Sequence, residues 1–193
     1  RDMKIAAGNF FEAFRIGQEI RHATPRTVSA GDMSLYIALY GTRIALNSSA
    51  EFARGLGYKD APIDDFLTFH LVFGKTVPDI SLNAVANLGY AAGQFLRPVY
   101  VGDTLSTVST VIGLKENSNH KTGNVYVRSV GRNQRGEAVL DYVRWVMVKK
   151  RDEASPTPEP VLPDLPDHVA ADSLRAPEGV DFSRYDAELA GSS

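Results

Sequence analysis

The chain has 193 residues, of which 44% are hydrophobic and 23% charged, and its formal net charge is -2. This composition suits one globular domain with a sizeable core, and the lack of a basic stripe argues against nucleic acid as a partner. With no cysteine there is neither a disulfide framework nor a thiolate metal site, and the four histidines are too scattered to show the spacing of metal ligands.

No apolar run approaches the roughly 20 residues that a membrane-spanning helix needs, and the first residues show no signal-peptide pattern. We therefore expect a cytoplasmic protein without a membrane partner. The sequence begins at Arg1 rather than at a methionine, so we also expect a trimmed or partial polypeptide.

The first elements predicted along the chain are a strand and two helices. Residues 18–27 alternate loosely between apolar and polar and predict a strand. Ser29 then begins a helix, because an aspartate follows three residues later as in a capping box, and Gly41 ends it. Residues 42–49 form a predicted loop, and a short second helix covers residues 50–56.

The longest helical segment covers residues 62–77, PIDDFLTFHLVFGKTV. Pro62 suits a first helical position, two aspartates place negative charge in the first turn, and Gly74 and Pro78 supply the stop. The apolar residues run most of the way round this helix rather than along one stripe. We therefore expect the helix to be buried on nearly every side, wrapped by the strands that follow.

After the long helix the pattern changes to four long strands rich in valine, threonine, tyrosine and leucine, separated by turn signals. They cover residues 84–95, 104–115, 123–133 and 138–149. Because the links are short, we expect an antiparallel meander, whose strands of roughly 36 Å can curve around a helix of about 24 Å. Both faces of the last strand are mostly apolar, which indicates a central or doubly covered position in the sheet.

The composition shifts abruptly at Arg151. Six of the ten prolines lie beyond it, among acidic and small residues, so this segment is extended and cannot bury a core of its own. We therefore expect one domain at residues 1–150 and, at residues 151–193, a proline-rich linker or tail that runs over a surface and leads to a second domain.

Residues 95–105 read FLRPVYVGDTL. This segment resembles the F-x-x-P-V-x-x-G-D-T-L hairpin of the MaoC-like family of R-specific enoyl-CoA hydratases, and the order of the predicted elements matches that family. The resemblance covers roughly residues 9–152. It implies an α+β domain of the hot-dog fold, in which one long central helix is wrapped by an antiparallel sheet of five or more strands.

Within this family, several segments of the chain, from HATPRTVSAGDMSLYIALYG to VLDYVRWVMVKKRD, resemble the N-terminal half of a double hot-dog hydratase. The resemblance implies reversible addition of water to an enoyl-CoA whose methyl-branched acyl group carries a free carboxylate. The resemblance also implies that the reaction needs no metal and no redox cofactor. Coenzyme A is part of the substrate. The implied partners are the acyl-CoA thioester and a second hot-dog domain, in the same chain or in a homo-oligomer.

The family positions water with the Asp and His of a D-x-N-P-x-H motif after the first helix, while N–H groups at the start of the long helix polarise the thioester carbonyl. Aligned from Gly41, this chain has Thr42 at the aspartate position and Asn47 at the histidine position. Neither side chain acts as a base near neutral pH, and losing such help costs on the order of 10²–10⁴ in rate per group. We therefore expect the catalytic Asp and His outside these 193 residues and assign this half the shaping of the substrate pocket.

Four residues near these positions are candidates for substrate contacts: Arg43, Asp64, Asp65 and Phe66. Arg43 could bind the acyl carboxylate bidentately, and the alternative is a solvated loop arginine. For the two aspartates the alternative is a structural role in the first helical turn, and for Phe66 a core position. Asp65 and His70 are also candidates for catalysis, although for His70 we favour a core histidine with one hydrogen bond.

Two interpretations compete with a hydratase. The missing Asp and His favour a non-catalytic subunit that binds acyl-CoA. The hot-dog fold also houses thioesterases, which act on the same class of substrate, so fold alone does not identify the reaction.

Overall fold

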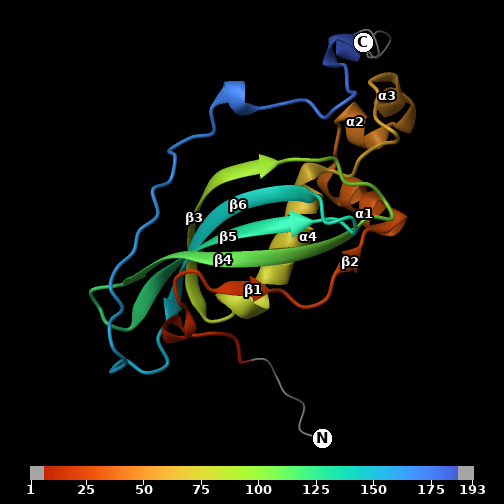
Figure 1. Cartoon of the computed structure of the whole chain (residues 1–193). Helices are drawn as coiled ribbons and strands as arrows, with labels where there is room; N and C mark the ends of the chain where they lie inside the picture. The colour runs from red at the N-terminus through yellow and green to blue at the C-terminus, as the bar shows by residue number, and fades with distance from the viewer. Residues whose placement is uncertain (1–6, 187–193) are drawn as a thin grey trace, which may run out of the picture.

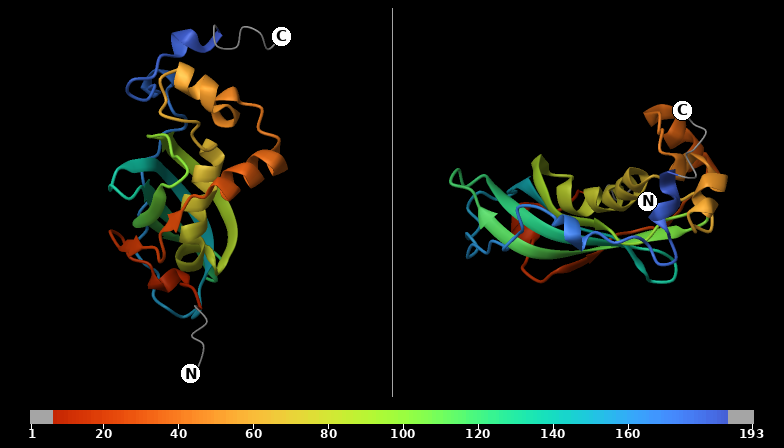
Figure 2. Two further views of the ribbon diagram at one scale, coloured as in Figure 1. Left: turned by 90° about the vertical axis from the view of Figure 1, so that its right-hand side faces the viewer. Right: turned by 90° about the horizontal axis from the view of Figure 1, so that it is seen from above.

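One long helix lies along one face of a curved antiparallel sheet in the computed structural model, which describes residues 7–186 (Figure 1, Figure 2). The helix is α4 (Asp65–Thr76), and the sheet has six strands. The four long strands are β3 (Ala84–Phe95), β4 (Thr104–Glu116), β5 (Thr122–Arg132) and β6 (Ala138–Lys149), and the short ones are β1 (Glu19–Arg21) and β2 (Arg26–Thr27). The predicted α+β arrangement is confirmed.

The long strands begin and end within one residue of the predicted positions, but the predicted meander is wrong. The strand order is β1-β4-β5-β6-β3, so only β4, β5 and β6 form a meander, and β3 pairs with β6 instead of β4. The link 96–103 bonds instead to the two segments that precede helices: Val99 O accepts from Ile63 N at 2.8 Å, and Gly102 N donates to Val28 O at 2.8 Å. The link therefore follows these segments instead of forming a tight turn between β3 and β4.

The strand β6 lies between β5 and β3, as its two apolar faces predicted. On the helix side, Leu140 and Tyr142 pack in one core cluster with Leu71 and Val72 of α4. Burying such side chains contributes about 1.5–3 kcal/mol each. This cluster fixes the distance of α4 from the sheet and therefore the place of the N-terminal end of α4.

The prediction that α4 is buried on nearly every side is wrong. Its buried residues, Leu67, Thr68, Leu71, Val72 and Thr76, face the sheet. On the opposite side Phe66 is 64% exposed and His70 is exposed, so neither holds the expected core position. The ring of His70 lies against Tyr36, at 6.2 Å between centroids. The sheet of this chain covers one side of the helix, and the other side keeps an apolar surface in solvent.

The boundaries of α4 also differ from the prediction. Asp64 is the N-cap, because its Oδ1 accepts from Phe66 N at 2.8 Å, and Pro62 precedes the helix instead of opening it. Gly74 lies inside α4 rather than ending it, and a π-helical turn, η2 (Val77–Ser81), continues past Pro78. Proline is tolerated there because it falls in the first residues of the new turn, where its missing N–H costs little.

Three short helices precede α4. The capping box predicted for the first, α1 (Ala30–Tyr40), is confirmed: Asp32 N donates to Ser29 Oγ at 3.1 Å and Ser29 N to Asp32 Oδ2 at 2.9 Å. The predicted loop after it holds a further helix, α2 (Ala45–Ser48), and then follows α3 (Ala50–Gly55). The sequence missed α2 because it has one turn and no side-chain cap. Among the described residues no helix has the length and apolar character that crossing a membrane requires.

The segment after β6 crosses the domain and returns to α3 (Figure 1). Val161 pairs with Leu114 of β4 through two backbone hydrogen bonds of 2.8 and 2.9 Å. Further on, Asp181 N donates to Leu56 O at 3.0 Å, and the ring of Tyr185 packs edge-on against Phe52, at 5.2 Å between centroids. We call residues 151–186 the tail. That it leads to a second domain stays a prediction.

Candidate functional site

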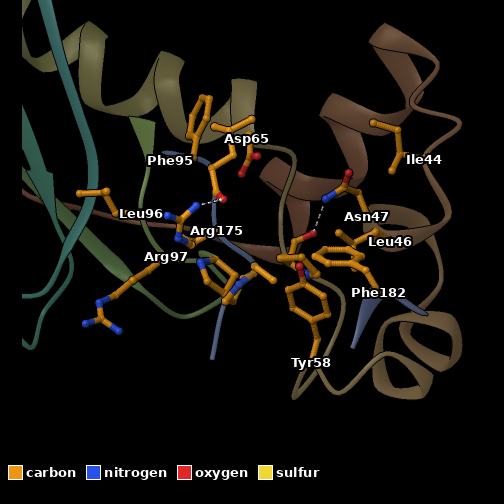
Figure 3. Close-up of a pocket in the computed structure, with 15 residues that line it drawn as sticks. Ile44, Leu46, Asn47, Tyr58, Asp65, Phe95, Leu96, Arg97, Arg175 and Phe182 are labelled. Carbon is orange, nitrogen blue, oxygen red and sulfur yellow. Dashed lines mark hydrogen bonds between the residues drawn. The ribbon is translucent and has the colours of Figure 1, made fainter. Parts of the chain in front are cut away.

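A cavity of about 460 Å³ lies at the N-terminal end of α4 (Figure 3). Its wall combines five parts of the chain: the α2 region, the segment before α4, the first residue of α4, the end of β3 with the link that follows, and the tail. Leu46, Tyr58, Leu96 and Phe182 supply apolar surface. The cavity is therefore built by tertiary packing of segments that lie up to about 140 residues apart, between Ile44 and Phe182.

The two degenerate dyad positions both lie beside the start of α4. Asn47 is buried, lines the cavity and donates from Nδ2 to Pro62 O at 3.1 Å. Thr42 donates from Oγ1 to Asp64 Oδ2 at 3.4 Å. An amide and a hydroxyl held in this way position backbone and cap but cannot take a proton from water. The side chains at the two positions therefore hold the segment before α4 and the cap of α4.

The side-chain carboxylate of Asp64 occupies the N-terminal end of α4. The N-terminal N–H groups of a helix have no intrahelical partners and attract negative charge, and Asp64 takes one of them by accepting from Phe66 N. A thioester carbonyl that approached this end would compete with that carboxylate. The geometry therefore favours a structural role for Asp64.

Two titratable groups in the wall of this cavity have altered pKa values, because burial raises the pKa of Tyr58 and also that of Asp65. Asp65 as a whole is exposed, yet the protein around its carboxyl group removes enough hydration to raise the pKa to about 6, with a smaller contribution from the charge of Asp64. A carboxyl with a pKa near neutrality can donate or accept a proton at physiological pH. Its place in the cavity wall keeps Asp65 a candidate for acid–base chemistry.

The structure places the other candidates outside the cavity wall. Arg43 is exposed on the loop between α1 and α2, and His70 lies further along the exposed side of α4. Phe66 packs edge-on against Phe95, at 6.5 Å between centroids, without lining the cavity itself. Of the residues singled out from the sequence, Asn47 and Asp65 therefore share this cavity.

Sequence reasoning missed two arginines that do line the cavity, Arg97 and Arg175. Arg97 belongs to the quoted hairpin segment, so that motif contained it without assigning it a role. Arg175 lies in the proline-rich tail, where no local signal marks a functional residue. Only the return of the tail to α3 brings it to the start of α4.

A second polar cluster lies in the interior near the C-terminal end of α4. His22 contacts Asp79 Oδ2 through Nδ1 at 2.6 Å and Ser109 Oγ through Nε2 at 2.7 Å, and Ser109 Oγ lies 2.7 Å from Ser129 Oγ. Burial lowers the pKa of His22, and the neighbouring Asp79 offsets part of that effect. Both serines are fully buried, so no substrate reaches them and the cluster is structural.

The described residues contain no group of three or more His, Cys, Asp or Glu side chains arranged to hold a metal ion. The polar side-chain groups of the cavity are an amide, a carboxyl, a phenol and two guanidinium groups. Chemically, this set can orient an anionic or carbonyl-containing ligand and exchange a proton through Asp65.

Comparison with known proteins gives matches across almost the whole chain. The model of a family described as mesaconyl-CoA hydratase matches residues 2–189. A mesaconyl-CoA hydratase of Cereibacter sphaeroides is 63% identical over 189 residues, and a β-methylmalyl-CoA dehydratase of Chloroflexus aurantiacus is 61% identical over 189 residues. Both alignments cover 98% of this chain but only 55% and 54% of the relatives. The chain thus spans about half the length of the curated relatives it matches.

Solved structures give the same picture of the fold. A crystal structure of a MaoC domain dehydratase from Chloroflexus aurantiacus is 60% identical, with a TM-score of 0.92, and covers 100% of this chain and 55% of that chain. A Mycobacterium tuberculosis protein described as a double hot-dog fold is 26% identical, with a TM-score of 0.72, and covers 89% of this chain and 52% of that chain. The predicted hot-dog fold is confirmed.

Proposed function

Because this chain belongs to the mesaconyl-CoA hydratase family of MaoC-like hot-dog proteins, we propose that it forms the substrate-shaping, dyad-lacking half of a hydro-lyase that reversibly hydrates mesaconyl-CoA to β-methylmalyl-CoA. The family match over residues 2–189 carries this proposal. The geometry supports the dyad-lacking part, since Thr42 and Asn47 stand at the family's Asp and His positions.

The proposed reaction adds water across the double bond of an enoyl thioester. A base removes a proton from water, the oxygen bonds to the β-carbon, the electron pair of the double bond moves toward the thioester carbonyl, and the α-carbon then takes up a proton. In this half, Asp64 occupies the helix N-terminus and the base positions hold an amide and a hydroxyl. We therefore place the catalytic Asp and His outside these 193 residues.

We further propose that a second hot-dog domain, in the same chain or in another copy, covers the apolar side of this one. Three exposed large apolar side chains of α1 (Leu35, Leu39 and Tyr40) are 61–68% exposed, and Phe66 of α4 is 64% exposed. The strand β3 is an edge of the sheet and adds exposed Leu88 and Tyr90. An exposed edge strand beside an apolar surface is what pairing with another domain would cover.

The test uses the native protein that carries this chain, with mesaconyl-CoA as substrate. We expect loss of the enoyl-thioester absorbance and a product heavier by one water, with no release of free thiol. Release of thiol would identify a thioesterase instead, and binding without any turnover would identify a non-catalytic acyl-CoA-binding subunit. Because we propose that no metal or redox cofactor takes part, the rate should be unchanged after treatment with a chelator.

A further inference from the structure

The cavity at the start of α4 contains positive charge that the described residues do not neutralise by ion pairs. Arg97 and Arg175 line it together with Asp65, and the same three residues line an adjoining cavity of about 720 Å³. Within residues 7–186, no carboxylate lies within the 4 Å of an ion pair from either guanidinium. Unpaired guanidinium groups at the wall of a cavity are strong candidates for binding an anionic ligand.

Arg175 is the better placed of the two. Its Nη1 donates to Leu174 O at 2.8 Å and also to Asp172 O, so the backbone of the tail itself orients the guanidinium. A guanidinium carries five N–H donors, and those not used in this way remain for a ligand. Figure 3 shows the Arg175 guanidinium turned toward the side of Leu96 and Asp65, whereas that of Arg97 extends away from the other labelled residues.

The part of the tail that carries Arg175 has a fixed place on the domain. Gly57 leaves room for it, because a Cβ at this position would lie 2.4 Å from Gly179 O. The bond from Asp181 N to Leu56 O and the contact of Phe182 with Tyr58, at 6.5 Å between ring centroids, hold the segment after Arg175 against the α3 region. Arg175 is therefore presented to the cavity by a docked segment, which reduces the entropy lost on binding.

From this geometry we propose that the cavity is an anion subsite of the assembled enzyme, in which Arg175 binds an oxyanion-bearing group of the acyl-CoA thioester. The inference rests on the proposed function. Two groups of the substrate share this chemistry, the free carboxylate of the acyl group and the phosphates of coenzyme A, and both suit bidentate binding by arginine. The apolar side chains of Leu96 and Phe182 line the same cavity and suit the methyl-branched carbon chain.

The experiment compares Arg175→Ala and Arg175→Lys with the unchanged native protein. Mesaconyl-CoA and crotonyl-CoA, whose acyl group is uncharged, serve as substrates, and free coenzyme A serves as an inhibitor. A lost charged hydrogen bond of about 1.5–3 kcal/mol predicts a rise in KM of roughly 10–100-fold in Arg175→Ala. We expect partial recovery in Arg175→Lys, which keeps the charge but loses the planar fork.

The two sources of the anion give different results. If Arg175 binds the carboxylate, KM rises for mesaconyl-CoA while crotonyl-CoA and inhibition by coenzyme A stay within about twofold of the unchanged protein. If it binds a phosphate, KM rises equally for both substrates and inhibition by coenzyme A weakens by the same factor. Unchanged KM values and unchanged inhibition, or an effect on kcat alone, would overturn the anion subsite.

Arg15→Ala is the matched control, because Arg15 is also an exposed arginine that donates from Nη1 to a backbone carbonyl, that of Ala13, but it lies beside η1 (Phe11–Ala13), away from the cavity. Its kinetics should equal those of the unchanged protein. If the unchanged protein does not hydrate mesaconyl-CoA, the proposed function fails separately. Calorimetric binding of mesaconyl-CoA, crotonyl-CoA and coenzyme A to the same variants then still decides the role of Arg175.

Discussion

Two titratable side chains of this domain have pKa values shifted in opposite directions from their ordinary values. Loss of hydration raises the pKa of Asp65 at the start of α4 to about 6, while burial lowers the pKa of His22 near the other end of the helix. In both cases burial disfavours the charged form of the side chain. This form is the carboxylate for Asp65 and the imidazolium for His22. The two groups therefore affect stability in opposite ways as the pH changes.

For Asp65, the folded chain binds a proton more tightly than the unfolded chain, whose carboxyl has a pKa of 3.8. The contribution of Asp65 to folding stability is thus present below pH 3.8 and is lost as the pH rises toward about 6. We expect Asp65→Asn to remove this loss, so that its thermal unfolding midpoint falls less between pH 4 and pH 7 than that of the unchanged protein. Parallel curves for the two proteins would contradict the shifted pKa.

The same variant tests whether Asp65 takes part in the reaction. Because we place the catalytic groups outside this chain, we expect kcat for mesaconyl-CoA to change by less than about tenfold in Asp65→Asn. A fall of the size typical of a lost general acid or base, on the order of 10²-fold or more, would instead assign Asp65 a catalytic role.

For His22 the sign is reversed, because its folded pKa lies below the ordinary value of 6.5. The contribution of His22 to folding stability is present above pH 6.5 and is lost as the pH falls below that value. We expect His22→Phe to lower the free energy of unfolding by about 1–3 kcal/mol at pH 7.5, since Asp79 and Ser109 lose a partner. The stability of this variant should also depend less on pH between 7 and 5. His120→Phe is the control, because that side chain is 71% exposed; an equal effect there would exclude a specific role for the buried cluster.

At the scale of elements, the tail is docked through glycines that leave no room for a side chain. A Cβ at Gly113, in the irregular part of β4, would lie 2.6 Å from Pro163 Cδ and 2.9 Å from Val161 O. A Cβ there would also lie 3.0 Å from Tyr126 Cδ2 of β5, but its two shortest contacts are with the tail, so the docked tail requires a glycine at this position. The tail in turn supplies part of the cavity wall, including Arg175.

We expect Gly113→Ala to displace the tail while the sheet stays folded. Limited proteolysis should then cut between residues 151 and 186 several times faster than in the unchanged protein, and KM for mesaconyl-CoA should rise as Arg175 loses its place. Gly74→Ala is the matched control: no atom lies within 4 Å of a Cβ there, and alanine in a helix is about 0.5–1 kcal/mol more favourable than glycine. Equal protease resistance in both variants would show that the tail does not depend on Gly113.

At the scale of the whole molecule, the domain leaves one side of its own central helix uncovered. The sequence predicted apolar residues most of the way round α4. In the structure these residues point in two directions: Leu71 and Val72 face the sheet, and Phe66 faces away from it. An apolar helix face in solvent is costly, so the amino-acid pattern is explained if a second domain supplies the missing cover.

We therefore expect Leu39→Glu to weaken the native assembly although Leu39 is 68% exposed in this domain. Burying an unpaired carboxylate against a second domain is unfavourable, so the thermal unfolding midpoint of the native protein should fall by several degrees. Ile16→Glu, at a position 48% exposed and outside α1, α4 and β3, should leave it unchanged. Equal midpoints for both variants would show that α1 faces solvent in the native protein.

Elements whose signals are local could be predicted from the amino-acid sequence. The capping box of Ser29 and Asp32, the left-handed Gly41 with φ of 59°, and the ends of the four long strands follow from neighbouring residues and were predicted. The hairpin segment at residues 95–105 also indicated the family, which the comparisons confirm; that Thr42 and Asn47 mark a missing base stays a prediction. These features depend on backbone preferences and side chains within a few residues of each other.

Which distant segments meet became known from the folded domain. The pairing of β3 with β6, the exposed side of α4 and the meeting of Arg175 with Asp65 in one cavity all depend on contacts between residues far apart along the chain. The cost of closing such long loops changes little with their length, so the sequence spacing does not reveal which partner is chosen. Packing and backbone hydrogen bonds in the folded domain make that choice, and with it the composition of the site.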